Sequence, residues 1–389
     1  MSALAINESE KETESFFDVG IIGGGLAGLA LSILLAQKNY KVILFEKEKY
    51  PFHRVCGEYI SLESWKFIES LGLKLLDLNL PVIKKLIVSA PNGNTIKSNL
   101  DLGGFGISRF LIDNELKKIA LSNGVKLLEQ TKVTDVAFNE KYFTIKYNGG
   151  SAQCPVAVGS FGKRSNLDVS WSRDFVKKKA NKLNNYVGVK YHIKTSFTPD
   201  TIALHNFKNG YCGISKIEEE KYCLCYLTTA QNLKSNNNSI RQMEQNILYK
   251  NPFLKKIFSE AEFLFPEPVT ISQISFDKKS NLENHILMIG DASGMITPLC
   301  GNGMSMALHA SKIAFGVIDL FLKEEITREE METNYQKLWK KNFEKRLKAG
   351  RFIQKLFGKE KITNLVISAL KPFPFLVKKM IKATHGKEF

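Results

Sequence analysis

Two spacings of apolar residues alternate along this chain and divide it into parts. Short runs of β-branched and aliphatic residues, for example at 19–22 and 286–289, precede segments whose apolar residues recur every three or four positions. The short runs predict buried strands, and the longer segments predict helices. We therefore expect one discontinuous α/β domain with a parallel sheet over residues 16–80, 101–166 and 271–323.

A second pattern fills residues 81–100 and 167–270. Apolar and polar residues alternate on both sides of Pro91-Asn92-Gly93, which predicts a hairpin. Four more β-rich runs separated by turns lie between Tyr186 and Thr229, and a helical interval follows them. These segments predict an antiparallel β lobe, inserted into the α/β domain and suited to carry a substrate.

Residues 324–389 combine lysines with Leu, Ile, Phe and Val at helical spacing, and KPFPF at 371–375 interrupts the pattern. We expect a C-terminal basic helical region. Two interpretations stay open for it. The helices either form a cap with solvated lysines or contact a membrane surface and collect an apolar substrate there.

The net charge of +16 raises the question of a nucleic-acid partner, because basic surfaces attract phosphates. The excess is mostly lysine and is spread along the 389 residues, so no such partner is expected. The first residues are polar and acidic rather than a secretion signal. The longest apolar run, 26–36, is too short to cross a bilayer. The expected location is cytoplasmic, with peripheral membrane contact through the tail as the open alternative.

The cysteines show no CxxC pair and no cluster with histidine at the spacing of metal ligands. The sequence therefore predicts neither a disulfide framework nor a metal site. The six are Cys56, Cys154, Cys212, Cys223, Cys225 and Cys300.

The segment from Asp18 to Glu48 predicts a dinucleotide-binding unit. A strand leads into Gly23-x-Gly25-x-x-Gly28, an apolar helix that begins at Leu26 and Ala27, and a second strand closed by Glu46 and Lys47. The glycines permit a tight turn, close approach of the backbone to a pyrophosphate and close packing of helix on strand. The helix N-terminus favours phosphate, and Glu46 is placed to accept hydrogen bonds from a ribose.

Two further blocks are GISRFLIDNELKKIA, which contains Arg109, and IGDASGMITPLCGNGMSMALHASKIA, which contains Asp291. Together with the glycine turn and Glu46, they resemble FAD-binding flavoproteins of the superfamily that includes aromatic-ring hydroxylases, such as p-hydroxybenzoate hydroxylase, and geranylgeranyl reductases. The resemblance covers most of 17–321 in blocks, and the inserted lobe is similar only in layout. It implies a three-layer FAD/NAD-binding Rossmann-like domain, with FAD as the cofactor.

The resemblance assigns roles to several residues. Arg109 matches an arginine near the FAD pyrophosphate, and Val133 matches a position whose backbone reaches the adenine. Asp291 matches an acid that holds a ribityl hydroxyl. Gly301 and Gly303 would let the start of the following helix approach the flavin and stabilise negative charge there.

The loop PFHRVCGEY is similar to the P-x-x-x-x-C-G segment of geranylgeranyl reductases. The similarity implies that Cys56 lies against the flavin ring, while Arg54 neutralises phosphate or substrate charge. Glu58 would serve as proton donor or base if burial raises its pKa. The open alternative is a structural turn with a buried cysteine and a solvated acid.

Three departures from the family patterns narrow the expected chemistry. Ser160-Phe161-Gly162 stands where hydroxylases carry A-D-G, which argues against their mode of nicotinamide use. Ser293-Gly294 follows GDA where hydroxylases have Ala-His, as in the reductase group. The W-x-W-x-I-P segment of flavin halogenases is missing, which argues against halogenation.

The sequence thus predicts an FAD-dependent oxidoreductase that acts on an apolar lipid, isoprenoid or polyketide-like molecule. Hydride transfer from flavin N5 to a double bond is the leading hypothesis, with NADH or NADPH as the external electron donor. The alternative is oxygen insertion through a flavin C4a-hydroperoxide in a dry pocket. A third hypothesis is a protein that binds lipidated partners on the same fold without catalysis.

Overall fold

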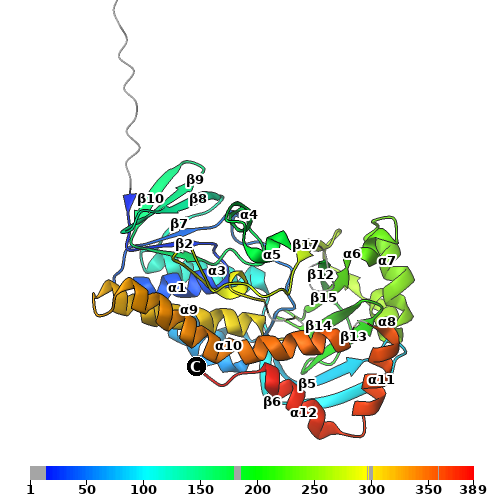
Figure 1. Ribbon diagram of the computed structural model, residues 1–389. Coiled ribbons are helices and arrows are strands. Elements are labelled where there is room, and N and C mark those ends of the chain that lie inside the picture. The colour runs from blue at the N-terminus through cyan, green and yellow to red at the C-terminus, as the bar shows by residue number, and fades with distance from the viewer. Residues whose placement is uncertain (1–14, 179–184, 296, 298–300, 358) are drawn as a thin grey trace, which may run out of the picture.

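The computed structural model describes residues 15–178, 185–295, 297, 301–357 and 359–389. The polar leader expected at the start of the chain, and Pro298 and Cys300 of the third sequence block, lie outside the described residues. Within them, the expected α/β fold, the antiparallel sheet and the C-terminal helices are all found (Figure 1).

A six-stranded sheet with the order β18-β19-β11-β2-β3-β7 forms the centre of the α/β domain. Its strands are parallel from β19 to β7, and β18 runs antiparallel to β19. Every residue of β2, β3 and β11 is buried, because both faces of the sheet are covered. The strands are β2 (Val19–Ile22), β3 (Val42–Phe45), β7 (Lys126–Leu128), β11 (Val156–Gly159), β18 (Leu282–Glu283) and β19 (Ile286–Met288).

Alternate residues of the central strands enter two different cores. Ile21 packs in a core with α1 (Leu26–Ala36), α3 (Arg109–Ser122) and α9 (Gly303–Leu322). Its neighbour Ile22 packs on the other face in a core with the four-stranded sheet β1-β10-β9-β8. The domain therefore has three layers. The outer strands are β1 (Ser15–Phe16), β8 (Val133–Phe138), β9 (Phe143–Tyr147) and β10 (Gly150–Cys154).

The second large sheet has nine strands in the order β16-β12-β15-β14-β13-β5-β6-β4, with β17 paired to β12. Its pairs are antiparallel except β13 with β5. The strands are β4 (Tyr59–Ser61), β5 (Val82–Ser89), β6 (Thr95–Gly106), β12 (Tyr186–Lys194), β13 (Thr201–Phe207), β14 (Gly210–Lys216), β15 (Tyr222–Thr229), β16 (Glu262–Phe263) and β17 (Val269–Ile274).

The predicted hairpin at Pro91-Asn92-Gly93 is confirmed as β5 and β6, but β6 is longer than expected. Gly103 adopts a φ of +76°, and a Cβ there would lie 2.9 Å from the carbonyl oxygen of Ile83. The register shifts beside this contact, and the strand continues to Gly106, where it pairs with β4. Residues 59–61 and 101–106 therefore pair in the nine-stranded sheet, whereas the sequence boundaries placed them in the α/β domain. The irregular Gly103-Gly104 step breaks the alternation that would have revealed the strand.

Helices cover both faces of the nine-stranded sheet. One face packs against residues of α7 and α8. The other face packs against α11, α12 and the end of α10. The long helix α10 also packs against α9, so it connects the α/β domain to this face of the sheet (Figure 1). The remaining helices are α2 (Trp65–Ser70), α4 (Asn166–Ser170), α5 (Asp174–Lys177), α6 (Ala230–Lys234), α7 (Ile240–Ile247), α8 (Pro252–Glu260), α10 (Arg328–Leu356), α11 (Glu360–Leu370) and α12 (Pro374–Thr384), with short 3-10 turns at 62–64, 75–78, 248–250 and 290–292.

The predicted break at KPFPF separates α11 from α12, since Pro374 is the first residue of α12. The sequence pattern missed one property of α9. Among the described residues, this 20-residue helix is long and apolar enough to cross a membrane by length and composition. In the structure it packs between α1 and α10 as a core helix.

A buried ion pair joins the segment after β11 to the loop that contains Asp291. Arg173 Nη1 lies 2.7 Å from Asp168 Oδ1, and both side chains are almost completely buried. The same guanidinium donates to the carbonyl oxygens of Ala292 and Ser280. Arg173 therefore fixes the position of the loop after β19.

Replacing Arg173 by Met is expected to lower the free energy of unfolding by about 3–5 kcal/mol, because Asp168 would stay buried without its partner. Urea unfolding followed by circular dichroism measures the change. The control is Lys118→Gln, which removes an exposed pair with Glu115 and should change stability by less than about 0.5 kcal/mol. Equal effects of the two substitutions would contradict the prediction.

Candidate functional site

The predicted glycine turn connects β2 to α1. Gly23 has a φ of +109°, and a Cβ there would lie 2.6 Å from the carbonyl oxygen of Ser160. A Cβ at Gly28 would lie 2.1 Å from the carbonyl oxygen of Gly23. Gly25 caps α1 without a side-chain hydrogen bond, so the first N–H groups of the helix point into the turn. Leu26 and Ala27 are the first, buried residues of this helix.

Arg109 begins α3 and faces the same turn. Its Nε and Nη2 atoms donate to the two carboxylate oxygens of Asp113 at 2.8 and 2.7 Å. A Cβ on Gly25 would meet Nη2 of Arg109 at 3.6 Å and no other described atom within 4 Å. The guanidinium group of Arg109 therefore faces the N-terminus of α1 across Gly25. A helix N-terminus and a guanidinium group are both suited to phosphate, and the predicted contact of Arg109 with a diphosphate stays a prediction.

Glu46 is buried beside the turn. Its carboxylate accepts hydrogen bonds from the backbone N–H groups of Gly24 and Glu48, and from Nη2 of Arg54 at 2.8 Å. A carboxylate can accept about four hydrogen bonds, so one position remains for a ribose hydroxyl. Lys47 is exposed, and its Nζ lies 3.7 Å from Glu48.

Arg54 lies at this end of the site, between Glu46 and Asp113. Its charge is balanced by these two acids, and its predicted role toward phosphate or substrate stays a prediction. Val133 is the buried first residue of β8, and its carbonyl oxygen accepts from Asn166 Nδ2 at 3.3 Å. Its predicted contact with adenine also stays a prediction, as does a cofactor contact of Lys47.

The third sequence block lies directly against the first. A Cβ on Gly290 would lie 3.3 Å from Cβ of Ala27. Asp291 follows Gly290, and the described residues donate no hydrogen bond to its carboxylate, which is half-buried. Gly301 has a φ of +64°, and Gly303 begins α9 without a side-chain cap. A carboxylate that accepts no hydrogen bond from the described residues and the N-terminus of α9 thus lie beside the dinucleotide turn, and the predicted contact of Asp291 with a ribityl hydroxyl stays a prediction.

Lys279 holds this block in place. Its buried Nζ donates to the carbonyl oxygens of Asp291 and Lys163 at 2.9 and 2.7 Å. Burial lowers the pKa of Lys279 to about 8. Lys163 in turn donates to the carbonyl oxygen of Val55, so the loop before Glu58 is linked to the Asp291 loop.

Glu58 is completely buried, with a φ of +55°. Its carboxylate is ion-paired with Lys190 and accepts from the backbone N–H of Arg109 at 2.9 Å. Nε2 of His192 lies 2.6 Å from the other carboxylate oxygen. Burial alone would raise the pKa of Glu58, but Lys190 and His192 outweigh it and lower the pKa to about 2. The expectation of a raised pKa was wrong, because the sequence did not show these two partners.

Cys56 is half-buried next to this cluster, and its carbonyl oxygen accepts from Sγ of Cys223. Potential ligand atoms of Glu58, His192 and Cys223 lie within 4.8 Å of one another. The ammonium group of Lys190 already supplies the positive charge beside Glu58, so this geometry is explained by ion pairing. Contact of Cys56 with a flavin ring stays a prediction.

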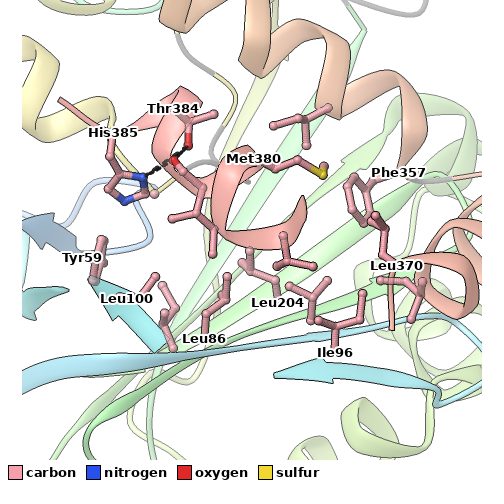
Figure 2. Close-up of a pocket in the computed structure, with 17 residues that line it drawn as sticks. Tyr59, Leu86, Ile96, Leu100, Leu204, Phe357, Leu370, Met380, Thr384 and His385 are labelled. Atoms are coloured by element: carbon pink, nitrogen blue, oxygen red, sulfur yellow. Dashed lines mark hydrogen bonds between the residues drawn. The ribbon is translucent and has the colours of Figure 1, made fainter. Parts of the chain in front are cut away.

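An apolar pocket lies between the nine-stranded sheet and the C-terminal helices (Figure 2). Its empty volume is about 830 Å³, a figure that includes the part open to solvent. The floor consists of residues from one face of β5, β6 and β13, such as Leu86, Ile96 and Leu204. Residues of α10, α11 and α12 form the roof, and Gly301 lies at its wall.

The polar residues of the pocket gather at one end. Figure 2 shows Tyr59, Thr384 and His385 on one side, and Phe357 and Leu370 on the other. The ring of Tyr59 lies beside Gly301, since a Cβ on that glycine would be 3.3 Å from the ring. Its hydroxyl is buried and has no hydrogen-bond partner among the described residues. Tyr59 thus brings a buried hydroxyl without a described hydrogen-bond partner close to the end of the pocket nearest the Asp291 block.

Sequence reasoning missed Tyr59, Lys190 and His192 as site residues. Lys190 and His192 lie two positions apart on an apolar strand, so they share one face of β12. A lysine and a histidine on the same face of a buried strand are a readable signal for a buried acid. No comparable signal marked the residues of α10 to α12 that form the roof of the pocket. Apolar residues at helical spacing predict a buried helix face but do not show which surface that face packs against.

Comparison with known proteins agrees with this geometry. Residues 17–203 match the pyridine nucleotide-disulphide oxidoreductase family. The chain is 25% identical over 370 residues to conditioned medium factor receptor 1 of Dictyostelium discoideum, covering 87% of this chain and 70% of the relative. It is 22% identical over 390 residues to the digeranylgeranylglycerophospholipid reductase of Methanococcus vannielii, covering 89% of each.

Solved structures show the same fold. The flavin-dependent brominase Bmp2 superposes with a TM-score of 0.77 at 19% identity, over 95% of this chain and 93% of the brominase. A geranylgeranyl bacteriochlorophyll reductase-like protein of Thermoplasma acidophilum gives a TM-score of 0.75 at 17% identity, over 97% of each chain. These matches agree with the glycine turn, Arg109 and Asp291: the chain has the fold of FAD-dependent oxidoreductases and is similar to a digeranylgeranylglycerophospholipid reductase and to a flavin-dependent brominase.

Proposed function

We propose that this enzyme reduces a carbon–carbon double bond of an elongated apolar molecule, such as a lipid, an isoprenoid or a polyketide-like compound. The observation that carries the proposal is the apolar pocket, which extends from Gly301 at the start of the α9 segment to α11 and α12. Its polar end lies at Tyr59, and its opposite end is lined by aliphatic and aromatic residues. A long apolar molecule would place one end near Gly301.

Bound FAD supplies hydride transfer at its N5 position. The residues of this chain hold the cofactor. The N-terminus of α1 and Arg109 would bind the diphosphate, Glu46 the ribose, and Asp291 a ribityl hydroxyl. NADH or NADPH is proposed as the external electron donor.

Saturation of a double bond needs one proton in addition to one hydride. Glu58 cannot supply it near neutral pH, because Lys190 and His192 keep its carboxylate ionised. Tyr59 is the better candidate. Burial raises the pKa of its hydroxyl, so the proton stays on the oxygen until a charged or polar substrate atom accepts a hydrogen bond from it. We propose that Tyr59 gives its hydroxyl proton to the substrate carbon next to the one that receives the hydride, that water reprotonates the phenolate when the product leaves, and that Glu58 is a positioning residue.

Oxygen insertion remains the second candidate, because a pocket with this apolar lining would also exclude water from a reactive intermediate. The position of Phe161 favours reduction. Its ring packs near Trp171 and Met288 in the core of the α/β domain, where hydroxylases carry an acid. Non-catalytic binding of lipidated partners is the third candidate. Uptake of FAD by the protein would argue against this third candidate.

Anaerobic reduction of the purified yellow protein by NADH or NADPH tests the proposed function. Addition of a lipid extract without oxygen should reoxidise the flavin and yield a saturated product in equal amount. Stoichiometric oxygen consumption with a hydroxylated product would contradict reduction in favour of oxygen insertion. A colourless protein that takes up no FAD would contradict both enzymatic hypotheses.

Replacing Tyr59 by Phe is expected to lower kcat by about a hundredfold or more, because general acids contribute roughly 10²–10⁴. FAD content should not change, since only one hydroxyl is lost. The control is Tyr147→Phe, a tyrosine of β9 in the outer four-stranded sheet. An unchanged rate of the chemical step in the Tyr59 variant, measured under single-turnover conditions, would show that Tyr59 does not take part in the reaction.

The depressed pKa of Glu58 predicts a pH dependence of stability. Ionised Glu58 stabilises the fold fully above its ordinary pKa of 4.5, and this contribution is lost as the pH falls toward about 2. The wild type should exceed Glu58→Gln by about 3–5 kcal/mol near neutral pH. This difference should shrink below pH 4.5, as measured by urea unfolding at several pH values.

Glu244 provides the matched control with the opposite sign. It accepts hydrogen bonds from Tyr191 and Tyr226, and burial raises its pKa. The wild type should therefore gain stability relative to Glu244→Gln as the pH falls through the carboxyl range. Parallel pH profiles for the two variants would contradict the assignment of Glu58 as the ionised member.

A further inference from the structure

The outer surface of α11 and α12 exposes apolar side chains. Residues 371–376, with the sequence KPFPFL, comprise the connection between the two helices and the first three residues of α12, and all six are exposed. We call this segment the tip. Phe375 is 64% exposed, Phe373 47% and Leu376 36%. Leu365, on the preceding helix, is 70% exposed. Such a concentration of large exposed apolar residues marks an interaction surface.

The tip is continuous with the apolar pocket. Leu370 directly precedes it and Val377 directly follows it, and both line the pocket. One side of these helices therefore forms the roof of the pocket, while the tip points to the outside. Figure 1 shows α12 at the lower edge of the molecule, next to β6, and α11 at the right-hand edge, next to β5. An apolar molecule bound at the tip would therefore lie close to the residues that line the pocket.

The charge of this region indicates which class of partner binds to it. Between residues 361 and 387 the chain has six lysines and no aspartate or glutamate. Lys371, Lys379 and Lys382 are exposed on the tip and on α12. Protein interfaces are depleted of lysine, whereas helices that lie on membranes combine lysine with Phe and Leu. The surface therefore fits anionic lipid head groups better than a protein partner.

We propose that the tip and α12 dock on an anionic lipid bilayer. Phe373, Phe375 and Leu376 enter the interface, and the lysines contact anionic head groups. The pocket then receives its substrate from the bilayer rather than from water, a step that rests on the proposed function. Docking itself does not depend on the reaction.

Flotation of the full-length, FAD-loaded protein with lipid vesicles tests the docking. The protein should bind vesicles of phosphatidylcholine and phosphatidylglycerol in equal parts, bind phosphatidylcholine alone much more weakly, and dissociate as salt is raised. Lys379→Gln with Lys382→Gln should lower the partition coefficient by roughly twenty-fivefold, at about fivefold for each lysine. Phe373→Ser with Phe375→Ser should lower it by roughly tenfold or more.

Matched substitutions far from the tip serve as controls. Leu76→Ser removes an exposed leucine, 76% exposed, and Lys126→Gln with Lys146→Gln removes two exposed lysines of the α/β domain. These variants should bind like the wild type, and FAD content and thermal melting should confirm that all variants are folded. Equal binding of tip and control variants, or no binding of the wild type, would overturn the proposal.

Two further measurements separate the alternatives. Sedimentation that shows a dimer of the wild type, lost in the Phe373→Ser, Phe375→Ser variant, would assign the surface to a second copy of the chain and overturn membrane docking. Anaerobic flavin reoxidation by a detergent-dispersed lipid extract reports on the proposed function alone. Reoxidation without vesicle binding would refute docking, whereas vesicle binding without reoxidation would refute the proposed reaction.

Discussion

The arrangement of both large sheets around the candidate site depends on the buried carboxylate of Glu58. A charge without contact to water is tolerated only when hydrogen bonds and an opposite charge surround it. Two of the partners, Lys190 and His192, come from β12, and the third is the backbone N–H at the start of α3. The antiparallel sheet and the α/β domain must therefore meet in one relative position. Tyr59 follows Glu58 directly, so this ion pairing also places the ring of Tyr59 at the pocket.

The pocket has two walls with different origins. Its floor is the regular face of a β-sheet, in which every second residue is aliphatic, and its roof consists of helices from the last part of the chain. Neither wall could remain exposed to water without cost, because each presents a continuous apolar surface. The roof helices therefore serve the fold and the site together. Their packing closes the sheet and leaves the space that a substrate would fill.

Much of the fold was readable from local patterns. The glycine turn, the α3 segment that ends at Asn123-Gly124, and the hairpin at Gly93 are fixed by residues that lie close together in sequence. The contact of Ala27 with Gly290 was reachable only through the family resemblance, since more than half of the chain separates the two residues. Features that depend on distant charges were only partly predictable. Lys190 and His192 on one face of β12 indicate a buried acid, but nothing in the sequence identifies Glu58 as that acid, and the pKa of Glu58 is opposite to the one expected from burial.

The two walls of the pocket are synthesised at different times, because they come from different parts of the chain. The floor is complete once residue 204 has been synthesised, whereas the roof begins with Ile353 and ends near residue 385. At ribosomal speeds of about 5–20 residues per second, the apolar floor waits roughly 10–30 seconds for its cover. During this interval the nascent chain presents a sheet face that other apolar surfaces can bind. Late closure of the pocket thus makes the growing chain most vulnerable to aggregation after its largest sheet has appeared and before its last helices arrive.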